Sequence, residues 1–141
     1  MPTREPKEPF AARFSRATLA HLNERAVRVG ANKTALAERY VEEGLRMDEH
    51  PLIYFRNGAA GRRPALLGTR LDVWQVIETV RQNDNSPADA AEYLDLPQSH
   101  VEVCIKYYLS YEREIDEWLA REREAADEAE HAWRRRQAMF A

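Results

Sequence analysis

Apolar and other residues alternate over a short stretch near the N-terminus. Positions 10, 12 and 14 are apolar and are separated by Ala11 and Arg13, which is the period of a half-buried strand. A five-residue strand leaves its backbone groups unpaired and cannot stand alone. We therefore expect it to pair antiparallel with the same strand of a second chain, so that the residues facing the helices and the dimer partner are Phe10, Ala12 and Phe14.

The apolar residues that follow recur at helical spacing. Ser15 is a good N-terminal cap, and Gly30 supplies a stop, so the pattern predicts a first helix between them. A second helix begins at residues 32–34 and ends near Met47, and its apolar stripe contains Leu36, Tyr40, Val41 and Leu45. Of these, Leu36 and Tyr40 are expected to contact the dimer partner. Residues 10–49 are thus predicted to fold as strand, helix, helix, the first of these preceded by a flexible, proline-rich arm over residues 1–9.

The pattern changes over residues 50–111. The short apolar runs LIYF and RPALL are separated by RNGAAGR, whose Asn-Gly pair is a turn signal, and this predicts a β-hairpin. Apolar spacing then predicts helices over residues 71–81, 88–94 and 98–108, with Ser86 as a cap. The short turn between the last two helices is typical of a helix-turn-helix.

Residues 112–141 contain no Gly or Pro and are dense in Glu, Arg and Ala, which predicts a long helix of about 40 Å. Its apolar stripe is too sparse for a core, yet Trp133 and Phe140 are costly to leave in water. Two destinations are open for this helix: a groove on another protein, or its own domain.

Composition and charge narrow the class of protein. The chain of 141 residues is small, so we expect a homodimer or a higher homo-oligomer to supply missing buried surface. Residues 1–41 carry a net +4 against -3 for the whole chain, so a basic head precedes a body of -7. No apolar run is long enough to cross a bilayer, and we expect a cytoplasmic protein with no membrane association.

The sequence indicates no catalytic, cofactor or metal site. A single Cys104 excludes an internal disulfide and a multi-cysteine zinc site, and it lies on an apolar helix face typical of a buried residue. The four histidines lack metal-ligand spacing, and GAAGRR lacks the Lys and Ser/Thr of a phosphate loop. We therefore predict that the protein is not an enzyme.

The segment FAARFSRATLAHLNERAVRVGANKTALAERYVEEGL resembles the Arc/MetJ ribbon-helix-helix family. The resemblance implies an intertwined dimer that contacts DNA bases through Ala11 and Arg13 and phosphates through Asn32, Lys33 and Thr34 at the second helix. A helix N-terminus favours phosphate on physical grounds as well. Lys7 and Arg16 lie close enough to the ribbon to contact phosphate. The alternative is an amphipathic helical hairpin in which Arg13 is only a surface charge.

Residues 52–111 resemble a bacterial antitoxin-associated family of small winged or helix-turn-helix domains. The signature G-T-R-x-x-V is present as Gly68, Thr69, Arg70 and Val73. A recognition helix here would expose a second set of DNA-binding residues, Gln98, Ser99, His100 and Lys106. Nearby carboxylates would repel phosphate, so we favour dimerisation or packing for this helix. Thr69 and Arg70 are interpreted as a strand-end cap and a structural ion pair.

The tail resembles that of VapB-type antitoxins, whose C-terminal segment wraps a PIN-domain ribonuclease. That resemblance implies toxin binding by Trp118, Trp133, Arg134, Arg135, Arg136 and Phe140. Contact with nucleic acid and a merely solvated charge run are the alternatives for the three arginines.

Together these inferences predict a mainly α-helical chain. It consists of an arm (1–9), a ribbon-helix-helix domain (10–49), a hairpin plus helix-turn-helix domain (50–111) and a partner-binding C-terminal helix (112–141). The functional hypothesis is a type II antitoxin that represses its own operon on double-stranded operator DNA and neutralises a toxin. One alternative is a stand-alone dimeric transcriptional repressor whose tail serves oligomerisation. Another is a structural interaction module, which would show no salt-dependent DNA binding.

Overall fold

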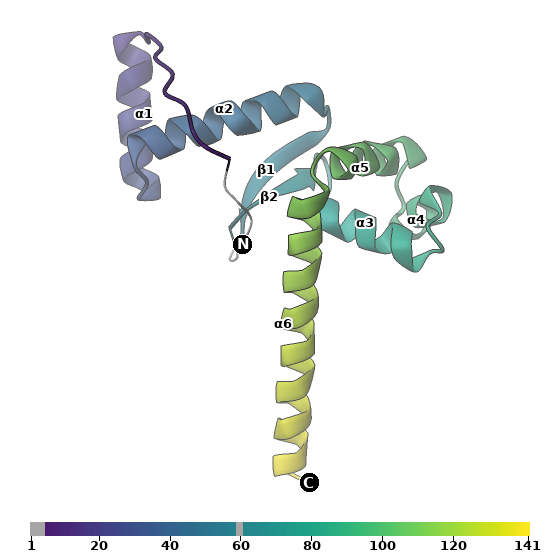
Figure 1. Ribbon diagram of the computed structural model, residues 1–141. Coiled ribbons are helices and arrows are strands. Elements are labelled where there is room, and N and C mark those ends of the chain that lie inside the picture. Colours follow the sequence, from purple (N-terminus) through teal and green to yellow (C-terminus); the bar gives the residue numbers. More distant parts are fainter. Residues whose placement is uncertain (1–4, 59–60) are drawn as a thin grey trace. The chain divides into compact units, whose positions relative to one another are not determined.

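Helices dominate the computed structural model of the chain, which describes residues 5–58 and 61–141 (Figure 1). Within these residues, a two-stranded antiparallel sheet lies between the second and third of six helices. The elements are α1 (Arg16–Val29), α2 (Lys33–Glu49), β1 (Ile53–Gly58), β2 (Gly61–Leu66), α3 (Val73–Gln82), α4 (Pro87–Leu94), α5 (Gln98–Ser110) and α6 (Glu112–Met139). The prediction of a mainly α-helical chain is confirmed.

The chain divides into two units, Met1–Glu42 and Glu43–Ala141. The division falls inside α2, ahead of the boundary predicted at residue 50. The end of α2 therefore belongs to the second unit, where its side chains form hydrogen bonds. Arg46, for example, donates hydrogen bonds to Tyr107 and Glu114. Part of the predicted arm, residues 1–4, lies outside the described residues.

Local capping sets the helix ends of the first unit. Ser15 Oγ accepts a hydrogen bond from the backbone N–H of Thr18 at 3.1 Å. Gly30 ends α1 in the left-handed conformation, φ 66°, which glycine adopts without strain. Both predicted caps are therefore confirmed.

The strand predicted over residues 10–14 is absent from the single chain. Residues 5–15 have no regular secondary structure, and Phe10 and Phe14 are exposed. The physical reason is that a strand needs a second strand to bond its backbone groups, and within residues 5–58 and 61–141 no other segment pairs with this one. The ribbon therefore stays a prediction about two chains.

The hairpin of the second unit is confirmed, and its strands are joined within the predicted segment RNGAAGR. β1 pairs with β2 from Ile53↔Leu66 to Gly58↔Gly61. Asn57 and Gly58 are thus the last paired residues of β1, and the connection between the strands is residues 59–60, which lie outside the described residues. The Asn-Gly pair therefore lies at the end of β1, directly before the connection, because strand pairing continues through it.

A buried carboxylate joins the hairpin to α3. Asp72, 2% exposed, lies at the N-terminus of α3 and accepts hydrogen bonds from Arg56 at 2.6 and 2.9 Å. Arg63 lies 3.1 Å from the second carboxylate oxygen, and the indole N–H of Trp74 donates to that oxygen at 3.1 Å. Two cations, an indole and a helix end therefore neutralise one charge that would be costly to bury alone.

Asp72 also corrects the interpretation of the G-T-R segment. Thr69 is the predicted strand-end cap, since its hydroxyl donates to the Leu66 carbonyl at 2.8 Å and accepts from the Leu71 N–H at 3.0 Å. Arg70 was wrongly predicted to form the structural ion pair: its side chain is exposed, and its carbonyl accepts a bond from Arg56. The structural ion pairs of this segment are formed by Asp72 with Arg56 and Arg63, because a buried carboxylate needs cations beside it.

Replacing Asp72 tests this junction. We expect Asp72→Asn to lower the free energy of unfolding by about 3 kcal/mol, because it leaves two partly buried guanidinium groups without their anion. Urea unfolding followed by circular dichroism measures the change. Arg70→Ala is the matched control and should stay within about 0.5 kcal/mol of the parent. Equal effects of the two substitutions would contradict this role of Asp72.

A second buried group, His50, follows the end of α2. Its ring, 4% exposed, lies edge-on to the rings of Tyr107 and Tyr111, at centroid distances of 5.1 and 5.8 Å. Burial lowers the pKa of His50 below its ordinary value, and Lys106 and Arg46 lower it further, against an opposing effect of Glu49. The imidazole is therefore buried in its neutral form.

This burial predicts a pH dependence of stability. The unfolded chain takes up a proton at His50 near its ordinary pKa of about 6.5, whereas the folded chain resists protonation. Stability should therefore fall as the pH decreases through 6.5, and the decrease should be smaller in His50→Gln. Urea unfolding at pH 7.5 and pH 5.5 measures both. The exposed-histidine variant His131→Gln should retain the parent's pH dependence; if His50→Gln retains it too, His50 is not its source.

The core of the second unit lies among the hairpin and α3 to α6. Its buried residues include Leu66 of β2, Val76 of α3, Val101 of α5 and Ile115 of α6. Cys104 belongs to this core, as predicted, and burial raises the pKa of its thiol to about 12. The first turns of α6 are thus anchored in the unit, and the remainder of that helix continues beyond the anchor (Figure 1).

Candidate nucleic-acid interface

The predicted base-contacting residues lie on the extended segment before α1. Ala11 and Arg13 are both exposed, as is Arg16 in the first turn of α1. Lys7 forms an ion pair with Glu38 of α2 at 2.7 Å, so its charge is partly neutralised within the chain. Arg13 and Arg16 therefore carry the positive charge that this segment presents to solvent.

The N-terminus of α2 differs from the predicted phosphate site in one respect. Asn32 Oδ1 accepts hydrogen bonds from the backbone N–H groups of Thr34 at 2.7 Å and Ala35 at 3.3 Å. Two amides that a phosphate would use are thus capped from within the chain. The exposed ammonium of Lys33 remains as the charged group at this helix end.

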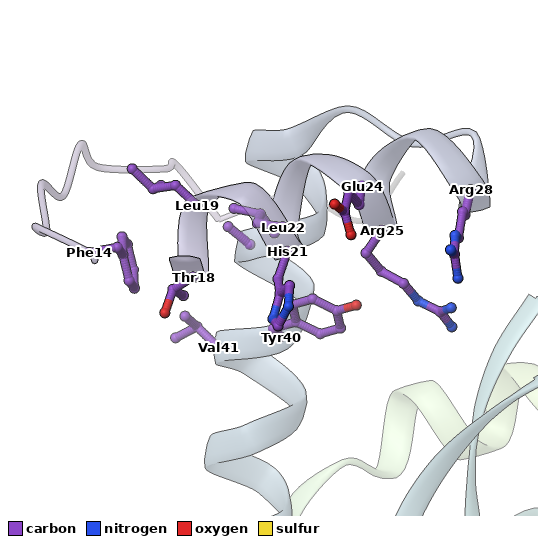
Figure 2. A pocket seen from close by; sticks show the side chains of 11 residues that line it. Phe14, Thr18, Leu19, His21, Leu22, Glu24, Arg25, Arg28, Tyr40 and Val41 are labelled. Atoms are coloured by element: carbon purple, nitrogen blue, oxygen red, sulfur yellow. The ribbon is translucent and has the colours of Figure 1, made fainter. Parts of the chain in front are cut away.

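A hollow in the same unit is lined mainly by apolar side chains. It has a volume of about 470 Å³, and Figure 2 shows Phe14 from the extended segment, Thr18 and Leu22 from α1, and Tyr40 and Val41 from α2 around it. Further lining residues are Leu19, His21, Glu24, Arg25, Arg28 and Ala37. Leu19 of α1 and Tyr40 and Val41 of α2 are the exposed large apolar residues of the two helices that line it.

The residues predicted to form the dimer interface are divided between core and surface. Leu36 is already buried within the single chain, at 1% exposure, together with Ala26 of α1. Phe10, Phe14 and Tyr40 are exposed, at 91%, 54% and 44%. Among the described residues of this unit only Ala26 and Leu36 are buried, so little apolar surface is removed from water without a partner.

The second predicted DNA-binding set lies on α5. Gln98, Ser99 and Lys106 are exposed, and His100 is partly buried. The opposite face of α5 packs into the core of its unit through Val101, Cys104 and Tyr107. The exposed surface of α4 and α5 also carries the carboxylates of Asp89, Glu92, Asp95 and Glu102, so the charge balance here opposes contact with phosphate.

The predicted toxin-binding residues are not all on the surface of α6. Trp118 is buried, at 4% exposure, and Arg121 lies over its ring at 4.3 Å, so this tryptophan packs within its own unit. Trp133 and Phe140 are exposed, at 59% and 75%. Arg134 pairs with Glu130 at 2.7 Å, while Arg135 and Arg136 are exposed. The start of the helix therefore packs within its own unit, and binding of its exposed remainder to another protein stays a prediction.

Comparison with known proteins gives no assignment. No family model, no curated protein and no solved structure matches the chain. In the described part of the chain, no cluster of three or more His, Cys, Asp or Glu side chains is arranged to hold a metal ion. No helix there is long and apolar enough to span a membrane.

Sequence reasoning missed two features of these surfaces. The hollow between α1 and α2 combines the two predicted stripes with Phe14, and only their packing shows that it stays open. The role of Asp72 had a usable signal, since an Asp directly before an apolar helical pattern is a common N-cap.

Proposed function

We propose that the protein is a dimeric DNA-binding regulator whose first unit pairs with the same unit of a second chain. The observation that carries this proposal is the exposure of the apolar residues around the hollow, chiefly Phe14, Tyr40 and Val41. A unit with so small a core is not expected to be stable alone. A second copy is the occupant that also supplies the missing strand.

Pairing of the two extended segments would form a ribbon with Arg13 on its outer face. Phe14 lines the hollow, so the preceding residue of an extended backbone points to the opposite side. A two-stranded ribbon fits the major groove of DNA, and arginine makes a bidentate contact with guanine. Lys33 at the start of α2 adds a contact for phosphate.

The first test replaces Arg13. We expect Arg13→Ala to lose about tenfold or more in affinity for the promoter fragment of the protein's own operon, because a good bidentate base contact is worth about 1–3 kcal/mol. Fluorescence anisotropy at two salt concentrations measures affinity, and light scattering shows whether the dimer persists. Arg113→Ala, which removes an exposed charge from α6, is the control and should bind as the parent does. Undiminished binding by Arg13→Ala would move base recognition elsewhere in the chain.

We further propose that this regulator is the antitoxin of a type II toxin–antitoxin system. In this proposal it represses its operon and neutralises a toxin, of the PIN-type ribonuclease class, through α6. What supports this part is the exposed end of α6, where Trp133 and Phe140 flank the run Arg134, Arg135 and Arg136. An acidic nuclease site is a chemically suitable target for such a run. The second candidate is a stand-alone repressor, favoured by the same exposed helix if its role is self-assembly.

Truncation separates these two candidates. Deleting residues 121–141 leaves the anchoring residues Ile115, Trp118 and Leu119 in place, so the second unit should remain folded. For an antitoxin, the truncated chain should bind promoter DNA as the parent does but should no longer co-purify with, or inhibit, the product of the adjacent open reading frame. If the full chain captures no such product while DNA binding persists, the stand-alone repressor is the correct candidate.

A further inference from the structure

One face of α6 is buried at its start and uncovered for the rest of its length. Ile115, Trp118 and Leu119 are buried, and Ile115 and Leu119 belong to the core that α6 shares with α3 and α5. At the same helical spacing, the face continues with four exposed residues: Ala126, Ala129, Trp133 and Phe140. A solvent-exposed stripe that ends in two aromatic side chains favours association with another apolar face.

The side chains of this apolar stripe are small in its first half and large in its second half. Ala126 and Ala129 form its first half, with Ala125 at its edge, whereas Trp133 and Phe140 form its second half. Two such helices pack best when they run antiparallel, because the large Trp133 of each can then lie beside the small alanines of the other. In a parallel pair, Trp133 would face Trp133 and alanine would face alanine.

The charged residues of the exposed part of α6 are also divided, with acidic residues first and basic residues after them. The segment 122–130 contains five acidic residues, Glu122, Glu124, Asp127, Glu128 and Glu130, and one basic residue, Arg123. The run Arg134, Arg135 and Arg136 follows. A parallel pair would set three arginines against three arginines, whereas an antiparallel pair sets each basic run beside an acidic segment.

The position of the pairing is indicated by the charged residues within the stripe itself. Glu122 and Arg136 share the apolar face, and Ala129 lies midway between them. When two helices run antiparallel with Ala129 near the centre of the overlap, Glu122 of each lies at the level of Arg136 of the other. Phe140 then reaches the level of Trp118, where the helix enters its unit, so the overlap uses the whole exposed length.

We propose that residues 120–140 of α6 pair antiparallel with the same segment of a second copy of this chain, with Ala129 near the centre of the overlap and Glu122 opposite Arg136. Complementary size and complementary charge both support this orientation. The proposal goes beyond DNA binding and does not rest on it, because unit 1 takes no part in the contact. A protein toxin, if one binds α6, would have to displace the second copy from this face.

Cysteine cross-linking of the full chain tests the orientation. Cys104 is fully buried and serves as an unreactive background. A short bismaleimide should cross-link two chains of Ala129→Cys efficiently. Ala125→Cys is the matched control, because its two copies would be about 12 Å or more apart along the axis of an antiparallel pair at 1.5 Å per residue, but adjacent in a parallel pair. Equal cross-linking of both variants, or of neither, would overturn the proposal.

Exchanging the charges at positions 122 and 136 tests the register of the pair. The charge variants are made in the Ala129→Cys chain, and the rate of cross-linking is measured. We expect Glu122→Arg and Arg136→Glu each to slow cross-linking about tenfold, since two ion pairs become two repulsive contacts. The double variant should recover to about the parent rate, because the two charges are exchanged across an antiparallel pair. In a parallel pair each charge faces its own copy, so the double variant would not recover. Failure of this recovery would overturn the assigned pairing, whatever the result of the DNA-binding experiments.

Discussion

The supply of buried apolar surface is the constraint on which this structure depends. Two helices and an extended segment cannot enclose their own apolar side chains, and in the first unit Phe10, Phe14 and Val41 remain in contact with water. The same constraint acts on the end of α6, because a single helix has no second layer to cover its stripe. Both regions have well-formed helices, and a second chain would supply the missing layer.

The second unit meets this constraint by itself. Its hairpin and helices enclose one apolar core, and ion pairs join its elements at the edges of that core. Asp72 holds two arginines from the hairpin at the start of α3. Arg46 bonds Tyr107 at 2.9 Å and Glu114 at 2.6 Å, and its guanidinium lies 4.0 Å from the centre of the Tyr111 ring. These contacts tie the end of α2 to α5 and α6 within the second unit.

The exposed side chains near the two ends of the chain differ in chemistry and favour different partners. Arg13 and Lys33 suit a polyanion, whereas the alanines, Trp133 and Phe140 of α6 suit a helical face. The acidic surface of α4 and α5 suits neither DNA nor a second acidic surface. This separation supports the proposal of a regulator that would bind DNA through its first unit and assemble through α6.

Local interactions were readable from the sequence, and long-range ones were not. Ser15, Gly30 and Ser86 each act within a few residues of themselves, so spacing and residue type predicted those helix ends. The strand pairing of Asn57 and Gly58 and the choice of Asp72 over Arg70 depend on residues brought together only by folding. The burial of Trp118 has the same origin, because a helical stripe does not show where its cover ends. The sequence alone thus determined the elements and their apolar faces, and the tertiary structure decided which faces are covered within one chain, since burial depends on contacts between segments distant in sequence.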